Sequence, residues 1–483
     1  MAPRDPDADR HLLEPGISLA APPPFAPDHP DLAWLFSLNR HGYRPGLRRI
    51  LGLLADLGHP ERGLRTVVVA GTNGKGSTTR LLAELCRAAG RRTAAYTSPH
   101  LLGVTERLEL DGRPVPLDDL LAAAARVRPL VDRHEASWFE TLTALAVLLA
   151  REAGMEVLVA EVGLGGRLDA TNALPAAAVL LTDVALDHQR ILGETVEAIA
   201  AEKLGLLKPG VPLVTAVSPE LRPQVFAAAV AAEAPCLFLD EAARLEDGPG
   251  GWRLVTRRAV HDGLPADLPP VQRRNAALAL MVLEELSARD PWWRLPADPA
   301  AALAGCFLPG RWHRLLVSPD LLLDTAHNDQ ALRQVLARFL AMPCAGRRVV
   351  LFGGMADKTV SPAVGELLAR CDRVVGAPIS LPRSRNREQL AALFLEQWRL
   401  PPERVELAAS PAAALATLAD RLEPQDALLV CGSCFLVAET LWALGYRELA
   451  ATRRPQPAAA VLGRLAAAGG GPAAEGQDRE GAS

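Results

Sequence analysis

A glycine-rich run decides how this chain folds: Gly71-Thr72-Asn73-Gly74-Lys75-Gly76-Ser77-Thr78. It follows the apolar, strand-like stretch 66–70 and opens the helix-like stretch 79–85. Glycines at such a junction let backbone N–H groups approach a phosphate group at the N-terminus of the helix. The run therefore predicts a phosphate-binding loop, and the first hypothesis is a nucleotide-binding enzyme.

The loop differs from the ordinary Walker pattern, in which a glycine and four further residues precede Gly-Lys-Ser/Thr. Val69 stands in the place of the first glycine, and Gly76 separates Lys75 from the hydroxyl of Ser77. An ordinary strand-to-helix turn is the alternative, but the flanking strand and helix are the elements that a phosphate loop needs. This unusual spacing of glycine, lysine and serine reduces the number of phosphate-binding families to which the chain could belong.

Lysine is rare in this chain. Lysine and arginine together number 52, and only four of them are lysines: Lys75, Lys203, Lys208 and Lys358. The two side chains are not interchangeable, because only lysine carries a compact amine that can lose its proton. We therefore expect the lysines to stand mainly where such an amine is needed.

The bulk composition limits the function classes. A chain of 483 residues is expected to form two or three domains. Its formal net charge of -4 gives no basic field, which argues against a nucleic-acid partner. There is no apolar run of about 18 residues and no charged leader, so we expect no membrane partner and a cytoplasmic location. The seven scattered cysteines suit a reducing compartment, and Cys431-Gly432-Ser433-Cys434 is interpreted as a loop with incidental thiols.

Short aliphatic runs alternate with longer amphipathic stretches, which is typical of parallel α/β sheets. A polar, Pro-rich segment (261–270) and helices from 272 to 305 separate two series of strands, and a second α/β domain is expected to begin near Pro309-Gly310. The composition of both ends predicts disorder. The expected strands are 66–70, 92–96, 157–161, 178–184 and 211–217, then 320–324, 347–353, 372–376, 404–408 and 426–431.

Two strand ends carry groups that suit a metal ion. Glu161 ends the apolar run 157–160, and His188 follows the run 178–184. Ligands gather at the carboxyl edge of parallel sheets, so a carboxylate there, near a phosphate loop, suits Mg²⁺. A solvated strand-end acid and a packed loop histidine are the alternatives.

Three further residues suit phosphoryl chemistry. Lys203 could pair with acidic neighbours on its own helix, but the rarity of lysine favours a special role. Arg311 could neutralise a transferring phosphoryl group, and Asp324, at the end of the run 321–323, could orient a ribose or a base. A plain surface cation is the alternative for Arg311.

Together these residues resemble the dihydrofolate synthase/folylpolyglutamate synthase family, a branch of the Mur ligase superfamily. The resemblance spans about residues 30 to 450. The matching stretches are 69–77, Tyr96-Thr97-Ser98-Pro99-His100-Leu101, 139–144, 161–172, Leu186-Asp187-His188, Glu202-Lys203-Leu204-Gly205, Gln272 with Asn275-Ala276, Pro309-Gly310-Arg311 and Asp324-Thr325-Ala326-His327-Asn328.

The resemblance implies an α/β fold class with two domains. We expect a P-loop, Mur-ligase-type central domain on a mainly parallel sheet and a smaller, Rossmann-like α/β C-terminal domain. The expected boundaries are a disordered extension at 1–28, the ATP-binding domain at 29–305, the glutamate-ligase domain at 306–453 and a disordered tail at 454–483.

The resemblance also implies the ATP and Mg²⁺ sites. The expected phosphate-binding residues are Asn73, Gly74, Lys75, Gly76, Ser77 and Thr78, and the further ATP contacts are Asn275, Arg311 and Asp324. Two Mg²⁺ ions are expected at Ser77, Ser98, Glu161 and His188. Lys75, Lys203, His188, Arg311 and His327 are the expected catalytic residues. Lys203 resembles the lysine that this family carbamylates, a modification that arginine cannot accept.

The substrates implied are L-glutamate, dihydropteroate and reduced folates, bound by a monomer. Trp138, Phe139, Glu140, Asp169, Ala170 and Thr171 match the segments that line the pteroate site, and Ser433 is a candidate for contacting glutamate. The γ-phosphoryl group would pass to a substrate carboxylate, and the amine of glutamate would attack the acyl phosphate. The two domains are expected to close and exclude water.

Other functions remain open on the sequence. The segments His41-Gly42-Tyr43-Arg44-Pro45-Gly46-Leu47 and 268–272 depart from the bacterial bifunctional enzymes, so a folylpolyglutamate synthase without dihydropteroate activity is the alternative. A muramyl-peptide ligase fits the Ser-Pro-His and Asp-Ala-Thr-Asn stretches less well. A small-molecule phosphotransferase would use the loop and Mg²⁺ but form no amide. A non-catalytic ATP-binding module would not need Lys75, Glu161 and Lys203 together.

Overall fold

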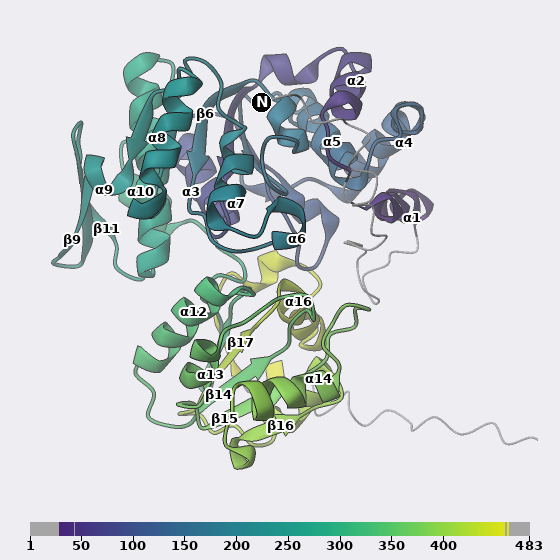
Figure 1. Ribbon diagram of the computed structural model, residues 1–483, viewed down its shortest axis with the longest axis vertical. Coiled ribbons are helices and arrows are strands. Elements are labelled where there is room, and N and C mark those ends of the chain that lie inside the picture. Colours follow the sequence, from purple (N-terminus) through teal and green to yellow (C-terminus); the bar gives the residue numbers. More distant parts are fainter. Residues whose placement is uncertain (1–28, 43, 459–460, 463–483) are drawn as a thin grey trace, which may run out of the picture. The chain divides into compact units, whose positions relative to one another are not determined.

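The computed structural model describes residues 29–42, 44–458 and 461–462. The chain divides into two compact units, Met1–Leu308 and Pro309–Ser483, and each unit has a large sheet of its own (Figure 1). The range 1–28, expected as a disordered extension, lies outside the described residues, as does most of the expected tail 454–483. In the described part of that tail, β18 (Gln456–Pro457) pairs with β12 (His313–Val317).

An eight-stranded sheet forms the centre of the first unit, in the order β4-β3-β2-β5-β1-β6-β7-β8. Its central strands are parallel, and only β3 and β4 at one edge are antiparallel. The prediction of a mainly parallel α/β sheet is therefore confirmed. The strands are β1 (Arg65–Ala70), β2 (Thr93–Tyr96), β3 (Leu108–Leu110), β4 (Arg113–Pro114), β5 (Val157–Glu161), β6 (Ala176–Leu181), β7 (Leu213–Thr215) and β8 (Cys236–Phe238).

Helices cover both faces of this sheet, because alternate residues of a strand point to opposite faces. Val67 and Val69 pack in one core with α3 and α10, whereas Val68 and Ala70 pack in another with α7 and α8. The helices are α1 (Pro30–Ser37), α2 (Arg48–Asp56), α3 (Lys75–Ala88), α4 (Leu117–His134), α5 (Trp138–Glu152), α6 (Gln189–Leu192), α7 (Val196–Leu204), α8 (Arg222–Ala231), α9 (Leu239–Ala242), α10 (Pro270–Arg289) and α11 (Pro299–Ala304).

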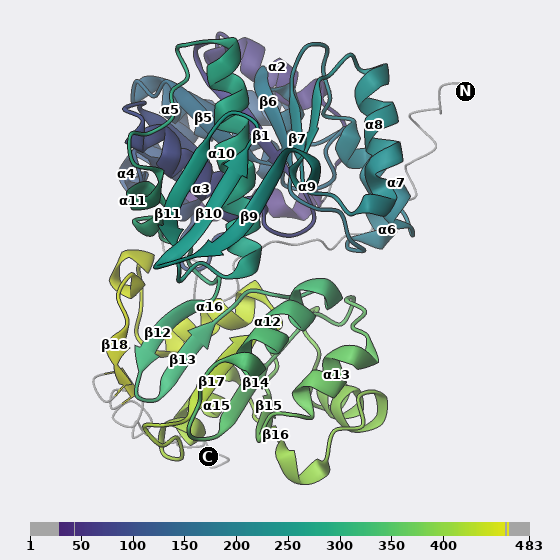
Figure 2. The same ribbon diagram turned by 90° about the vertical axis from the view of Figure 1, so that its left-hand side faces the viewer.

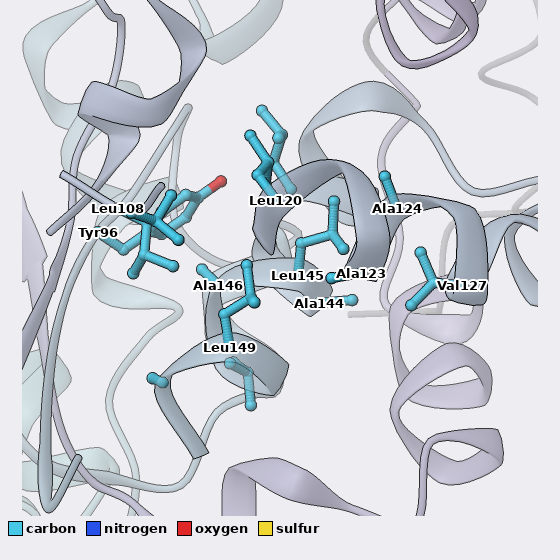
Figure 3. Packing of buried hydrophobic residues seen from close by; sticks show 14 of the residues in the cluster. Tyr96, Leu108, Leu120, Ala123, Ala124, Val127, Ala144, Leu145, Ala146 and Leu149 are labelled. Atoms are coloured by element: carbon cyan, nitrogen blue, oxygen red, sulfur yellow. The ribbon is translucent and has the colours of Figure 1, made fainter. Parts of the chain in front are cut away.

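A third core joins α4 and α5 to the edge of the sheet. Small and branched residues of the two helices alternate at the contact, where Ala123 and Ala124 of α4 lie near Ala144 and Leu145 of α5 (Figure 3). Alanines let the two helices approach closely, and Leu145 fills the remaining space. This core fixes the first turn of α5, which carries Trp138 and Phe139.

A separate antiparallel sheet, β9 (Ala243–Gly248), β10 (Gly251–Thr256) and β11 (Val260–Pro265), lies next to α10 (Figure 2). The sequence analysis missed it and interpreted 261–270 as a polar connection. The reason is that only one face of the sheet is buried: Trp252, Leu254 and Leu264 pack against α10, while residues between them face solvent. Short strands with one exposed face have a weak apolar pattern.

The second unit contains a seven-stranded sheet in the order β16-β15-β14-β17-β13-β12-β18. Only the β12–β13 pair is antiparallel. The strands not yet given are β13 (Asp320–Leu323), β14 (Arg348–Phe352), β15 (Arg373–Gly376), β16 (Val405–Leu407) and β17 (Ala427–Cys431), and the helices are α12 (Asp329–Ala341), α13 (Pro362–Leu368), α14 (Arg387–Ala391), α15 (Pro411–Ala419) and α16 (Cys434–Ala443). Among the described helices, none is both long and apolar enough to span a bilayer.

Candidate active site

The glycine-rich run connects β1 to α3, as its sequence predicts. Gly71 and Gly74 have positive φ angles of 148° and 81°, which favour glycine. A side chain at Gly71 would collide with the hydroxyl of Thr182, and a Cβ at Gly74 would lie 2.7 Å from Asn275 Oδ1. The glycines therefore allow two neighbouring segments to approach the loop closely.

Lys75 begins α3 and folds back over the loop. Its Nζ donates to Gly71 O at 3.1 Å and to Thr72 O at 3.2 Å. Asn275, on α10, is buried beside the loop and donates to Gln272 Oε1 at 3.0 Å. The structure thus brings together Gly74, Lys75 and Asn275, which the sequence analysis assigned to ATP.

Lys203 lies in the last turn of α7 and reaches the same loop. Its side chain is buried, and its Nζ donates to Gly71 O at 2.8 Å, so the two lysines Lys75 and Lys203 converge on one carbonyl oxygen. Burial, followed by the positive charge of Lys75, lowers the pKa of Lys203 to about 7. An amine with such a pKa is about half neutral at pH 7 and mostly neutral above it.

Glu161, Ser98 and Ser77 lie around Gly76. Glu161 is buried at the end of β5, and its Oε2 accepts a hydrogen bond from Ser98 N at 2.9 Å. A Cβ at Gly76 would lie 3.1 Å from the same carboxylate oxygen. The Oγ of Ser77 is buried and has no hydrogen-bond partner among the described residues. This hydroxyl and carboxylate suit a hard cation that keeps phosphate oxygens as further ligands.

His188 lies on a separate turn, in the left-handed conformation (φ 50°) just before α6. Its imidazole is 41 % exposed, and its Nε2 is 3.9 Å from Asp187 Oδ1. Within the described ranges, no three His, Cys, Asp or Glu side chains gather closely enough to hold a metal ion by themselves. A metal ion at this sheet edge would therefore need hydroxyl or phosphate oxygens in addition to the Glu161 carboxylate.

The first turn of α5 places the residues that the resemblance assigned to the pteroate group. Trp138 stacks on Phe36 with a centroid distance of 4.9 Å. Phe139 lies 5.8 Å from Tyr96 and packs over Gly163, where a Cβ would lie 2.5 Å from the ring. Trp138 Nε1 is buried without a hydrogen-bond partner among the described residues.

The carboxylates of Glu140 and Asp169 accept hydrogen bonds from neighbouring groups of the protein. Glu140 accepts from Ser137 N at 2.8 Å, from Ser137 Oγ at 2.7 Å and from Arg49 Nε at 3.1 Å. Asp169 accepts from Leu164 N at 2.9 Å and from Thr171 Oγ1 at 2.6 Å, and burial raises its pKa. Both acids hold local turns, and Ala170 and Thr171 follow directly on the turn that Asp169 forms.

The remaining candidates lie at the carboxyl edge of the sheet in the second unit. Asp324 follows β13 and accepts from Trp312 N at 2.8 Å and from Ala326 N at 2.9 Å; burial raises its pKa, and the charge of Arg311 opposes this shift. His327 Nδ1 lies 3.0 Å from Thr325 O. Ser433 caps α16 after the neighbouring strand β17 and accepts from Phe435 N.

The sequence analysis missed two residues that contact the loop, Thr182 and Asp183. Asp183 Oδ1 accepts from Asn73 N at 2.6 Å, and Thr182 Oγ1 donates to Asn73 O at 2.6 Å. Both stand in the predicted strand 178–184, where an acid follows an apolar run. The signal was the same as for Glu161, a carboxylate at the carboxyl edge of a parallel sheet.

Comparison with known proteins gives consistent matches. Residues 310–434 match the family model described as "Mur ligase, glutamate ligase domain". A dihydrofolate synthase/folylpolyglutamate synthase of Escherichia coli is 32% identical over 86% of this chain and 95% of its own length. A probable bifunctional folylpolyglutamate synthase/dihydropteroate synthase of Haloferax volcanii is 34% identical, and there the match covers 86% of this chain but only 50% of the longer protein.

Two solved structures are similar over nearly their whole length. The structure of E. coli FolC in complex with DHPP and ADP has a TM-score of 0.79 and 30% identity, covering 86% of this chain and 98% of that one. A bifunctional folylpolyglutamate synthase/dihydrofolate synthase with Mn, AMPPNP and L-glutamate bound has a TM-score of 0.77 and 30% identity, covering 87% of this chain and 100% of that one.

Proposed function

Because this chain belongs to the dihydrofolate synthase/folylpolyglutamate synthase family of Mur ligases, we propose that it joins L-glutamate to dihydropteroate and to reduced folates, using ATP. The observation that carries the proposal is the convergence of Lys75 and Lys203 on Gly71 O. A simple phosphotransferase would use the loop and Lys75, but it has no need of a second, buried amine with a lowered pKa.

The nucleotide is ATP with a divalent metal ion, as in the relative that binds AMPPNP and Mn. We assign Asn73, Gly74, Lys75, Gly76, Ser77 and Thr78 to the phosphates. Two Mg²⁺ ions are proposed at Ser77, Ser98, Glu161 and His188; the buried Ser77 hydroxyl, which has no hydrogen-bond partner among the described residues, and the Glu161 carboxylate near Gly76 fit such a ligand set. When bound, Mg²⁺ neutralises charge on the phosphates.

Lys203 is proposed to work as a carbamate. Its neutral amine would attack the carbon of CO₂, form a C–N bond and release one proton, which leaves a negative carboxylate on the side chain. The lowered pKa supplies the neutral amine, and the contact with Gly71 O places it against the phosphate loop. Among the neighbouring charges, those of Lys75 and Asp183 act most strongly on the Lys203 amine.

The ligation then needs charge neutralisation and two bond changes. The substrate carboxylate takes the γ-phosphoryl group of ATP, while Lys75 and Arg311 offset the developing negative charge. The amine of L-glutamate attacks the acyl phosphate, forming the amide and expelling phosphate. His327 is proposed beside the transferred phosphoryl group, and Asn275 and Asp324 are proposed as nucleotide contacts.

The acceptor is proposed to lie against the first turn of α5 and the turn after β5. Trp138, Phe139, Ala170 and Thr171 offer the aromatic and small surfaces for the pteroate group, while Glu140 and Asp169 hold those surfaces in place. Ser433 is proposed to contact glutamate. We further propose that the protein acts as a monomer in the cytoplasm, where ATP is available.

The second candidate is a folylpolyglutamate synthase without dihydropteroate activity. It is favoured by the segments 41–47 and 268–272, which differ from the bacterial bifunctional pattern. Residue 43 lies outside the described residues, while Arg44 holds the rest of the first segment to Glu135 O at 3.0 Å.

The deciding experiment offers the purified protein ATP, Mg²⁺ and L-glutamate with either dihydropteroate or tetrahydrofolate, and identifies amide products by mass. Amide from both acceptors establishes the bifunctional ligase. Amide from tetrahydrofolate alone establishes the polyglutamylase. Hydrolysis of ATP with neither amide would contradict the proposed function.

A further inference from the structure

The turn that follows β6 contacts the first residues of the phosphate loop. Asp183 Oδ1 accepts from Asn73 N at 2.6 Å and from Thr72 N at 3.1 Å. Thr182 Oγ1 donates to Asn73 O at 2.6 Å and to Ala70 O at 3.2 Å. Two adjacent side chains therefore bind both polar groups of the Asn73 backbone.

The same turn makes further contacts with Thr72. Ala185 N donates to Thr72 Oγ1 at 3.0 Å, and Thr72 Oγ1 donates to Ala185 O at 3.2 Å. Gly71 allows this approach, because a Cβ there would collide with Thr182 Oγ1. Gly71 thus allows contact with the turn after β6, whereas Gly74 and Gly76 lie at the start of α3.

Asp183 also occupies donors that a phosphate group could otherwise use. A carboxylate that accepts two backbone N–H groups makes charge-assisted bonds, which are stronger than neutral ones. With Thr72 N and Asn73 N directed at Asp183, the loop offers its N–H groups to an anion only from Gly74 onward. The carboxylate also lies near Lys75 and Lys203 and balances part of their charge.

We propose that Thr182 and Asp183 are positioning residues for the nucleotide: they hold residues 71–73 in a fixed conformation, so that the phosphates meet the Asn73 side chain and the backbone N–H groups from Gly74 onward. This inference rests on the nucleotide site of the proposed function and deepens it. A loop that is already ordered binds its ligand without a further loss of conformational entropy. Without these anchors, the loop must be ordered when the nucleotide binds, so nucleotide affinity falls while acceptor affinity stays.

The test compares Asp183→Ala, Asp183→Asn and Thr182→Val in the full chain. Binding of ADP with Mg²⁺ is measured by calorimetry, and KM is measured for ATP, acceptor and glutamate. We expect Asp183→Ala to weaken ADP binding about 10-fold or more and Thr182→Val about 3-fold. Asp183→Asn keeps an oxygen that accepts from both N–H groups, so its ADP affinity is expected to remain within about 3-fold of the wild type.

Two matched controls carry the same chemical changes away from the loop. Thr215→Val removes a buried hydroxyl of β7 that donates to Leu181 O, at the end of the neighbouring strand β6. Asp426→Ala removes a buried carboxylate that accepts from Arg347 N and Glu423 N in the second unit. Both controls are expected to lower thermal stability and to leave the ADP affinity within about 2-fold of the wild type.

Three results would overturn the inference: wild-type ADP affinity in both Asp183→Ala and Thr182→Val, equal rises in KM for all three substrates, or an Asp183→Asn variant as weak as Asp183→Ala. If Asp183→Ala does not fold, the ADP affinities of Thr182→Val and Asp183→Asn test the inference. The proposed function is tested separately, because a wild type that binds ADP but forms no amide would refute that function and leave the binding comparison intact.

Discussion

At the scale of single residues, Lys203 combines deep burial with a basic neighbour. Its amine contacts Gly71 O, and the pKa falls to about 7 because burial and the charge of Lys75 both disfavour the ammonium form. A guanidinium in its place would stay charged at every accessible pH. The proposed carbamate therefore requires lysine at this position, in a chain whose cationic side chains are mostly arginine.

The first prediction concerns the exchange of this lysine. Lys203→Arg is expected to lower kcat by about 100-fold or more, because arginine forms no carbamate and remains charged. Lys208→Arg is the matched control: Lys208 Nζ donates to Asn172 O at 2.9 Å and to Leu174 O at 2.8 Å, which a guanidinium can replace. Amide formation and thermal unfolding are measured for both. Near-normal turnover by Lys203→Arg would refute the carbamate.

The second prediction follows from the direction of the pKa shift. Above pH 7 the Lys203 amine is mostly neutral, the form that the proposed reaction with CO₂ needs, and below pH 7 it is mostly protonated and unreactive. After removal of CO₂, the rate of reactivation by added bicarbonate, at a fixed concentration of dissolved CO₂, should rise through about pH 7 and level off above it. A rate that climbs steadily from pH 8 to pH 10 would indicate an ordinary lysine instead.

At the scale of elements, the glycine turn after β5 packs against the end of α7. A Cβ at Gly166 would lie 2.9 Å from Glu202 O and 3.0 Å from Lys203 Cα. Arg167 Nη2 adds a bond to Glu202 Oε1 at 2.8 Å, and Asn172 Nδ2 donates to Gly205 O at 3.2 Å. The turn that carries Asp169 and the helix that carries Lys203 are therefore joined by close backbone packing and by two side-chain hydrogen bonds.

The third prediction tests this contact. Gly166→Ala is expected to cost about 2 kcal/mol of stability and to lower kcat, because backbone atoms of α7 cannot yield as a flexible side chain would. Gly248→Ala in β9 is the control, since its added methyl group meets only Gly251 O at 4.0 Å. Thermal unfolding and turnover are compared. Equal effects of the two changes would show that the close contact has no role.

A second element contact joins α2 to the first turn of α5 through a buried ion pair. Arg49 Nε lies 3.1 Å from Glu140 Oε2, and the two side chains are only 16% and 5% exposed. Glu140 also closes the N-terminal capping box of α5 with Ser137. Phe139 lies between Ser137 and Glu140 in the sequence. The ion pair and the capping box therefore both help to position Phe139.

The fourth prediction is that Arg49→Met, which leaves the buried Glu140 without its cationic partner, costs about 3 kcal/mol of stability and raises the KM for the acceptor but not for ATP. Arg126→Met breaks the exposed pair Arg126–Glu152, which joins α4 to the end of α5, and should cost less than about 0.5 kcal/mol. Unfolding midpoints and both KM values are measured. An unchanged acceptor KM in a destabilised Arg49→Met protein would limit the pair to a structural role.

The strands differ in how closely their positions could be predicted from the sequence. β1 and β5 were predicted closely, because strands buried on both faces read as continuous apolar runs. The sheet β9–β11 was missed, because its buried residues alternate with exposed charged ones and a bulge interrupts the pairing of β10 with β11. The apolar face of this sheet is buried by α10, which follows the sheet in the chain. The local sequence of the three strands therefore does not show that they are buried.

At the scale of the whole molecule, the chain consists of two units with separate cores. In the second unit, Phe339, Phe352, Phe394 and Trp398 form an aromatic centre under a seven-stranded sheet. The candidate residues are also divided, since the phosphate loop and Lys203 belong to the first unit and Arg311 and His327 to the second.

The fifth prediction is that residues 309–483, produced alone, fold cooperatively, because their core is complete without the first unit. Residues 1–308 alone should bind ADP with Mg²⁺ but form no amide, since Arg311 and His327 are missing. Circular dichroism on heating and calorimetry check both pieces. Amide formation by residues 1–308 alone would contradict the roles proposed for the second unit.

The sequence by itself determined the α/β class, the phosphate loop, the candidate residues and the family resemblance, because glycine spacing and apolar periodicity act over short stretches of chain. Only the tertiary structure decided which groups these residues meet. It placed Thr182 and Asp183 beneath the loop, brought Lys203 to Gly71 O and turned Glu140 and Asp169 inward. Such contacts depend on strand order, register and helix packing, which bring together residues far apart in the chain and which no local stretch encodes.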